Sequence, residues 1–203
     1  MKKYAVLHEP GDIVTLAGTR FVVLDVERRG SLPDSLFLLA LESVGASEFG
    51  SSNNYAESDL KKAVDKWLED MGKRGLDNAK LIPREIDLTT LDGSGCYGKL
   101  SVKAAPLTLD EAREYADIIP NAERWCWLAT GWSGPSKSDG DLALCVNSSG
   151  GWNYYGCSYS CGIRPALKAP SILFEDSEAG LDLSKIPTDD LLQEIHRRLA
   201  EKA

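Results

Sequence analysis

The segment of residues 147–161, NSSGGWNYYGCSYSC, places the strongest constraint on how this chain folds. It contains no charged residue and no aliphatic side chain, so it lacks the residues that usually fill a protein core. Tyr, Trp, Asn, Ser and Gly dominate antibody contact loops, where rigid rings supply area and small polar residues supply hydrogen bonds. The flanking segments have ordinary core composition. We therefore expect a recognition surface carried by a packed scaffold.

The length and charge of the chain limit its architecture and partners. Its 203 residues, 43% hydrophobic and 27% charged, are typical of one globular domain with room for an appendage. The net charge is -8, and Lys and Arg are not clustered. Because nucleic acids and anionic membranes attract basic clusters, we expect neither as a partner.

The N-terminus, MKKYAVLHEPGD, does not resemble a signal peptide. The apolar run behind its two lysines is broken by His8, Glu9 and Pro10, which makes it too short for a signal-peptide core. No apolar stretch approaches transmembrane length. We expect cytoplasmic synthesis without a signal peptide and no membrane insertion. Association with a virion is one route by which such a protein acts outside a cell.

An odd number of cysteines favours free thiols over a disulfide framework. The spacing of Cys157 and Cys161 fits poorly to a C-x2-C zinc motif, and His8 and His196 are far away in sequence. No Lys or His flanks these two thiols to stabilise a thiolate. We therefore expect no metal, no cofactor and no catalytic residue. The five cysteines are Cys96, Cys126, Cys145, Cys157 and Cys161.

Alternating apolar residues predict several strands. Residues 11–26 predict a hairpin, and residues 142–146 predict a strand. Residues 35–41 are consistent with a buried strand, although their periodicity alone leaves a helix open. Residues 162–167 predict a last strand in which Pro165 requires either an edge position or departure from the sheet.

Two helices are predicted from capping residues and apolar spacing. Ser58 is the expected N-cap of the first helix, which Gly72 and Gly75 end. The second follows Thr108, which forms a capping-box pattern with Glu111. The apolar residues of the first helix are Leu60, Val64, Trp67 and Leu68.

The chain after residue 170 has a different composition. It is acidic and irregular until Thr188, which is the expected N-cap of an amphipathic helix. We expect a ligand-binding domain over residues 1–170 and an acidic linker with a C-terminal helix over residues 171–203. That helix is the candidate for self-association or for docking on a scaffold partner. Its apolar stripe consists of Leu191, Leu192, Ile195 and Leu199.

The aromatic residues of the 147–161 segment are the main candidates for ligand contacts. Alternate residues of a strand point to opposite faces, so about half of these rings are expected to be structural. The other half would form the binding face, since Trp and Tyr are enriched at contact hot spots. The predicted contact residues are Asn147, Ser148, Trp152, Asn153, Tyr154, Tyr155, Ser158 and Tyr159.

Two other polar motifs have simpler interpretations. Asp139 and Asp141 offer carboxylates for calcium, but two acids around one glycine fit a polar turn better than a site for six to eight oxygen ligands. Arg164 is expected to hold a buried carboxylate or backbone carbonyls rather than an external anion.

The order of five motifs resembles a bacterial and phage domain family of unknown function. The motifs are GDIVTLAGTRFVVLDV, SSNNYAESDLKKAVDKWL, APLTLDEAREYA, WCWLATG and GIRPAL, which span residues 11–167. That family is similar to formylglycine-generating-enzyme-like proteins, which have a C-type lectin fold. The resemblance implies an α+β domain with twisted antiparallel sheets and two helices, followed here by a helical tail. The sequence departs from the family where residues 125–130 read WCWLAT, without the usual Arg.

The position of the 147–161 segment, directly before Gly162-Ile163-Arg164, resembles the variable proteins of diversity-generating retroelements. In those proteins a hypervariable patch precedes a terminal Gly-Ile/Val/aromatic-Arg motif. The resemblance implies a non-enzymatic phage or prophage protein that binds a protein or glycan target. One alternative is a cysteine-dependent oxidase of the formylglycine-generating type that uses Cys157 and Cys161, although its copper-binding pair is expected elsewhere in the fold. Another is a structural virion component.

Overall fold

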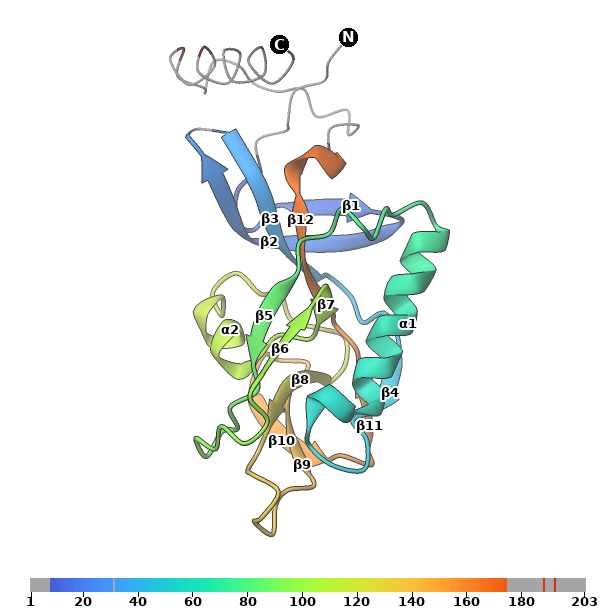
Figure 1. Ribbon diagram of the computed structural model, residues 1–203, viewed down its shortest axis with the longest axis vertical. Coiled ribbons are helices and arrows are strands. Elements are labelled where there is room, and N and C mark those ends of the chain that lie inside the picture. Colours follow the sequence, from blue (N-terminus) through green and yellow to red (C-terminus); the bar gives the residue numbers. More distant parts are fainter. Residues whose placement is uncertain (1–7, 31, 175–187, 189–191, 193–203) are drawn as a thin grey trace.

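The computed structural model describes residues 8–30 and 32–174, together with residues 188 and 192. These residues form an α+β fold with mostly antiparallel sheets and two helices, one of them long. Figure 1 shows α1 along one side of the molecule and α2 on the opposite side, with the sheets between them. The predicted α+β class is therefore confirmed.

The first sheet has five strands in the order β1-β2-β3-β12-β7. The predicted hairpin is present: β1 and β2 are joined by Ala17 and Gly18, whose φ angles of 46° and 76° suit a tight hairpin turn. Residues 35–41 fall largely in strand β3, which pairs antiparallel with β2 and excludes the helical alternative. The strands are β1 (Ile13–Leu16), β2 (Thr19–Arg29), β3 (Leu32–Ala40), β7 (Ala104–Ala105) and β12 (Ala166–Pro170).

The second sheet also has five strands, in the order β10-β9-β8-β11-β4. Its central strand β8 is buried along its whole length, whereas β10 is an edge strand. A separate two-stranded sheet pairs β5 with β6. The strands are β4 (Ala46–Glu48), β8 (Cys126–Gly131), β9 (Leu142–Val146), β10 (Trp152–Gly156), β11 (Ser160–Gly162), β5 (Arg84–Asp87) and β6 (Lys99–Val102).

The chain leaves the second sheet near Pro165, which is one of the two predicted alternatives, so residues 162–167 form parts of two strands. Strand β11 ends at Gly162 in the second sheet, and β12 begins at Ala166 in the first. Proline has no N–H to donate to a ladder, so the connection between two sheets is a position where it costs little. Arg164, in this connection, donates to the carbonyls of Ala40 and Pro120, at 3.0 and 3.1 Å. Its predicted role in binding backbone carbonyls is confirmed.

Both helices begin at the predicted caps. Ser58 accepts a hydrogen bond from Lys61 N at the start of α1 (Asp59–Lys73), and Gly75, with φ of 103°, follows the helix end. Gly72 lies inside the helix. Helix α2 (Leu109–Glu114) has both hydrogen bonds of the capping box, but it is only six residues long. Short 3-10 turns precede α1 (Tyr55–Glu57) and follow β12 (Ser171–Phe174).

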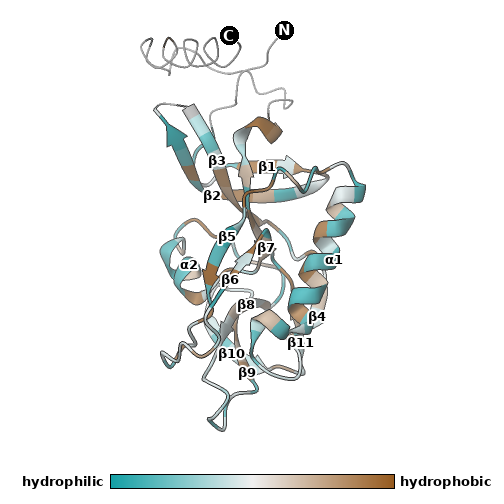
Figure 2. Ribbon diagram, viewed as in Figure 1, coloured by the Kyte–Doolittle hydropathy of each residue, from teal (hydrophilic) through white to brown (hydrophobic). Residues whose placement is uncertain are grey.

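The two sheets share two clusters of buried residues. The larger joins both sheets to α1, with Leu38, Trp127 and Val64 as examples. The smaller lies under α2 and includes Leu39, Leu128 and Leu109. Polar residues gather instead at the tip of the β2–β3 ribbon, which is hydrophilic in Figure 2. This packing fixes β8 and β9 and presents β10 at the edge.

The packed part of the chain continues past residue 170, where the sequence predicts the start of a linker. Ser171 is buried and donates to the carbonyl of Pro33 at 2.7 Å, and Phe174 belongs to the larger core cluster. Thr188 and Leu192 of the predicted tail helix are helical and exposed. Leu191, Ile195 and Leu199 lie outside the described residues, so the apolar stripe stays a prediction. No helix in the described part of the chain has the length and apolarity needed to cross a membrane.

Candidate functional site: an aromatic surface and an acidic pocket

The predicted contact segment forms a hairpin at the edge of the second sheet. Asn147 builds its turn: the side-chain oxygen accepts hydrogen bonds from the backbone N–H groups of Ser149 and Gly151, each at 2.9 Å. Because this oxygen already accepts hydrogen bonds within the turn, it has little capacity left for the ligand contact that the sequence predicts for Asn147. The neighbouring Ser148 is exposed, and so is Ser158 after β10.

The rings of β10 divide between the two faces of its sheet. Trp152 and Tyr154 lie on one face and are each 46% exposed. Tyr154 packs against Trp132, with 4.4 Å between ring centroids. On the other face lie Asn153 and Tyr155, because successive strand residues alternate. The division of the rings between two faces follows the predicted alternation, and Tyr155 is half-buried.

Tyr155 joins a second group of rings beside a cavity. Its centroid is 5.0 Å from that of Trp125 and 5.1 Å from that of Tyr159. Tyr159 is 59% exposed, so much of this group is open to solvent. The cavity has a volume of about 400 Å³, and Arg124, Ser160, Cys161 and Gly162 complete its lining. We call the six rings of both groups the aromatic surface: Trp125, Trp132, Trp152, Tyr154, Tyr155 and Tyr159.

Trp125 and Trp132 were not among the predicted contacts. Trp125 stands directly before β8 in an apolar run, and Trp132 stands directly after β8 in a segment with loop composition. Their position at the two ends of a strand that neighbours β9 brings them to the β10 hairpin. In the sequence, only their aromatic character could have marked them as candidate contacts. Their position beside the predicted segment follows from the order of the strands in the sheet.

Cys161 contacts Cys145, whereas the oxidase alternative uses Cys161 together with Cys157. The thiol of Cys161 accepts a hydrogen bond from Cys145, which lowers the pKa of Cys161 and raises that of Cys145. Burial, reinforced by Asp141, raises the pKa of Cys157 to about 12. Burial also raises the pKa of Cys126 to about 11. Three of the four buried thiols are therefore held in the protonated form at neutral pH.

Asp139 and Asp141 lie in the turn that leads into β9. The carbonyl of Asp139 accepts a hydrogen bond from Leu142 N at 3.1 Å, as a polar turn requires. Across the residues that the structure describes, no three His, Cys, Asp or Glu side chains are grouped in a way that would hold a metal ion.

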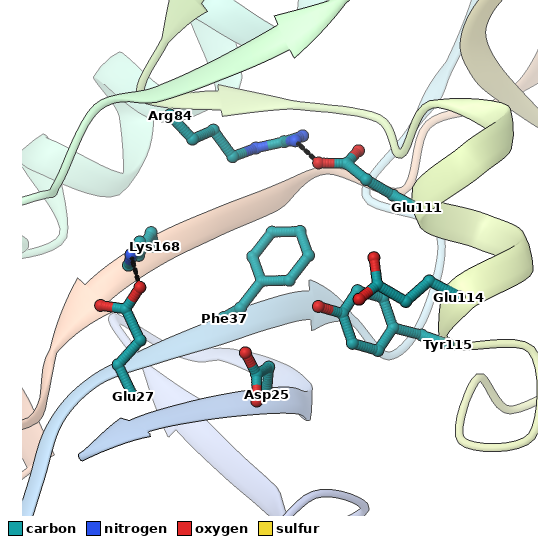
Figure 3. A pocket seen from close by; sticks show the side chains of 8 residues that line it. All are labelled: Asp25, Glu27, Phe37, Arg84, Glu111, Glu114, Tyr115 and Lys168. Atoms are coloured by element: carbon teal, nitrogen blue, oxygen red, sulfur yellow. Dashed lines mark hydrogen bonds and ion pairs between the residues drawn. The ribbon is translucent and has the colours of Figure 1, made fainter.

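A second cavity lies between α2, β5 and the first sheet (Figure 3). Its volume is about 210 Å³, and four of its eight lining side chains are carboxylates. We call it the acidic pocket. Nothing in the sequence pattern indicated it, because its residues come from five separate elements. They are Asp25, Glu27, Phe37, Arg84, Glu111, Glu114, Tyr115 and Lys168.

Two ion pairs cross the acidic pocket (Figure 3). Arg84 pairs with Glu111 and also donates to the carbonyls of Ala105 and Pro106, at 3.0 and 3.2 Å. Its side chain is only 8% exposed. Lys168 pairs with Glu27. These contacts join α2 to β5, and β12 to β2.

Comparison with known proteins gives no relative for this chain. Neither the family models, nor the curated proteins, nor the solved structures contain a match. The geometry above is therefore the basis for the functional argument.

Proposed function

We propose that this protein is a non-enzymatic binding protein that contacts a protein or glycan target through the aromatic surface. The observation that carries the proposal is the exposure of Trp152, Tyr154 and Tyr159 on a rigid edge strand. Exposed rings of this size are large apolar areas that folding leaves in contact with water. Tyr and Trp lose little conformational entropy on binding, so they make strong contacts when a partner covers them.

The cavity beside Tyr155 and Tyr159 supports the same proposal. It is lined by three rings and by the polar groups of Arg124 and Ser160, and ligand sites commonly combine an apolar wall with a few polar groups. Among the described residues, the only ion pair of Arg124 is a 3.9 Å contact of its Nε with exposed Glu123. Such exposed pairs contribute little, so the guanidinium is available to a ligand.

The finer assignment rests on the sequence resemblance. We propose a C-type lectin fold and a phage or prophage origin, with residues 147–161 diversified by a retroelement. The passage of the chain from the second sheet to the first at residues 162–166 supports this proposal. Core packing holds the end of the 147–161 segment in place there, while β10 stays at the edge of its sheet. The predicted tail helix would then provide self-association or scaffold docking.

The test is a screen of the full chain against arrayed glycans and displayed proteins. Every hit is measured again with Trp152→Ala/Tyr154→Ala/Tyr159→Ala and with Ile172→Ala as the control. Ile172 is 60% exposed but lies in the 3-10 turn after β12, away from β10. We expect hits that the triple variant loses and the control keeps. Hits that survive in the triple variant would refute the role of the aromatic surface.

The oxidase alternative makes a different prediction about thiols. An oxidase that uses Cys157 and Cys161 needs both thiols to react, but Cys157 is buried and its pKa is raised to about 12. Cys96 is exposed. We expect a thiol reagent at pH 8 to label Cys96 quickly in the folded protein and Cys157 only after denaturation. Rapid labelling of Cys157 and Cys161 would favour the oxidase.

A further inference from the structure

We propose that the acidic pocket binds the ammonium or guanidinium group of a ligand. Its residues lie on β2, β3, β5, β12 and α2, none of which carries a residue of the aromatic surface. This site is therefore additional to the proposed function and independent of it.

The charges that line the pocket do not balance. Arg84 and Lys168 are each paired, with Glu111 and Glu27 respectively. Asp25 and Glu114 remain, and neither forms an ion pair with any residue that the structure describes. Asp25 uses one carboxylate oxygen to accept the N–H of Val26, at 2.8 Å. Two carboxylates facing one cavity would both gain from a positive group placed between them.

The aromatic wall of the pocket suits the alkyl part of an organic cation. Phe37 and Tyr115 meet edge to face, with 5.6 Å between their centroids. The guanidinium carbon of Arg84 lies 5.2 Å from the centroid of Phe37. The pocket thus already holds one internal cation against a ring, and cations are attracted to aromatic faces. Figure 3 shows Arg84 above Phe37, Asp25 below it, and Glu114 and Tyr115 to its right.

Two side chains of the pocket, Tyr115 and Arg84, give further information about its electrostatic potential and its hydrogen bonds. Burial raises the pKa of Tyr115 to about 12, and Glu114, Asp25 and Glu111 add to this increase. Burial disfavours the charged phenolate, and the neighbouring carboxylates add a negative potential that disfavours it further. Separately, the Nε–H of Arg84 is buried and has no acceptor among the residues that the structure describes. A buried donor without an acceptor is costly, so an ordered water is expected to accept this hydrogen bond beside the ligand.

The volume of the pocket limits the size of the ligand that it can bind. At about 210 Å³ it is below the range of about 300–1,000 Å³ that is usual for drug-sized ligands. It suits one charged group with a short alkyl chain. Such a group is found both in small amines and in the Lys or Arg side chains of a protein partner.

The test is an NMR titration of the full chain with n-butylamine and with methylguanidine, using n-butanol as the uncharged analogue. We expect saturable shifts of the Phe37 and Tyr115 signals with the two cations and none with n-butanol. Asp25→Asn and Glu114→Gln should each weaken binding about tenfold or more, since each removes a charged acceptor for the cation. Asp117→Asn removes an exposed charge that does not line the pocket and should leave binding unchanged.

Three results would overturn the proposal: equal binding of n-butanol, no saturable binding of either cation, or unchanged affinity in both carboxylate variants. Asp25 and Glu114 are exposed, so both variants are expected to fold, which circular dichroism checks. Capped Gly-Lys-Gly and Gly-Arg-Gly peptides separate the two sources of the cation. Tighter binding of a peptide than of n-butylamine supports a basic side chain of a partner, and the reverse order supports a small amine.

Discussion

The aromatic surface and the acidic pocket relate to the core in opposite ways. The exposed rings of Trp152 and Tyr159 lie on or next to an edge strand, so we expect the sheet to keep its strand order without them. The charged groups of the acidic pocket join separate elements, as Arg84 joins β5 to α2. In the first region, the residues that we propose for recognition lie apart from the core. In the second region, the ion pairs that join the elements lie beside the unpaired carboxylates that we propose for binding.

The largest effect on stability is expected in the acidic pocket. Arg84→Ala removes the partner of Glu111, two hydrogen bonds to backbone carbonyls and the contact with Phe37. Breaking a buried ion pair by deleting one partner costs about 3–5 kcal/mol. Urea unfolding should show a loss of that size. The control Arg113→Ala removes an exposed pair with Asp110 and should cost less than about 1 kcal/mol.

Within the aromatic surface, Tyr155 is expected to depart from the general pattern. Its ring is half-buried and contacts both Trp125 and Tyr159. Each aromatic pair contributes about 0.5–1.5 kcal/mol beyond area burial, so Tyr155→Ala should lose roughly 2 kcal/mol. Trp152→Ala should change the unfolding free energy by no more than about 0.5 kcal/mol. If both variants lost about 2 kcal/mol of unfolding free energy, the exposed rings would contribute to stability as the residues of the acidic pocket do.

A pH titration tests whether the acidic pocket has the negative potential that the structure indicates. Tyr115 should titrate near pH 12, above its ordinary value of about 10, and Asp25→Asn should bring the pKa down. A raised pKa means that the folded state holds this proton more firmly. The stabilisation is therefore fully present below about pH 10 and is lost as the pH rises toward 12. Ring NMR signals of Tyr115 follow the titration, and an ordinary pKa would contradict the account.

Local sequence patterns predicted the helices and strands, whereas the candidate sites depend on contacts between residues that are far apart in the sequence. The β1–β2 hairpin and both helix caps depend on residues a few positions apart, so the sequence was sufficient for them. The division of residues 162–167 between two sheets depends on packing between strands that are far apart in sequence. The same holds for the pairing of Cys161 with Cys145.

The candidate sites show the same limit. Composition and alternation predicted the rings of β10 and their two faces, but only the sheet order brings Trp125 and Trp132 beside them. The acidic pocket was not predicted at all, since Asp25 and Glu114 are far apart in the chain and meet only when α2 packs beside the first sheet.

The most direct test of the account measures binding and stability on the same single variants. For the strongest hit of the array screen, the dissociation constant and the thermal midpoint are compared for Trp152→Ala, Tyr159→Ala and the control Ile172→Ala. A contact hot spot contributes about 2 kcal/mol or more, so at least one ring variant should bind about 30-fold more weakly. Its midpoint should stay within about 2 °C of the unmodified chain, as expected for a surface substitution. Unchanged binding together with a large fall in the midpoint would show that these rings are structural and would contradict the central claim.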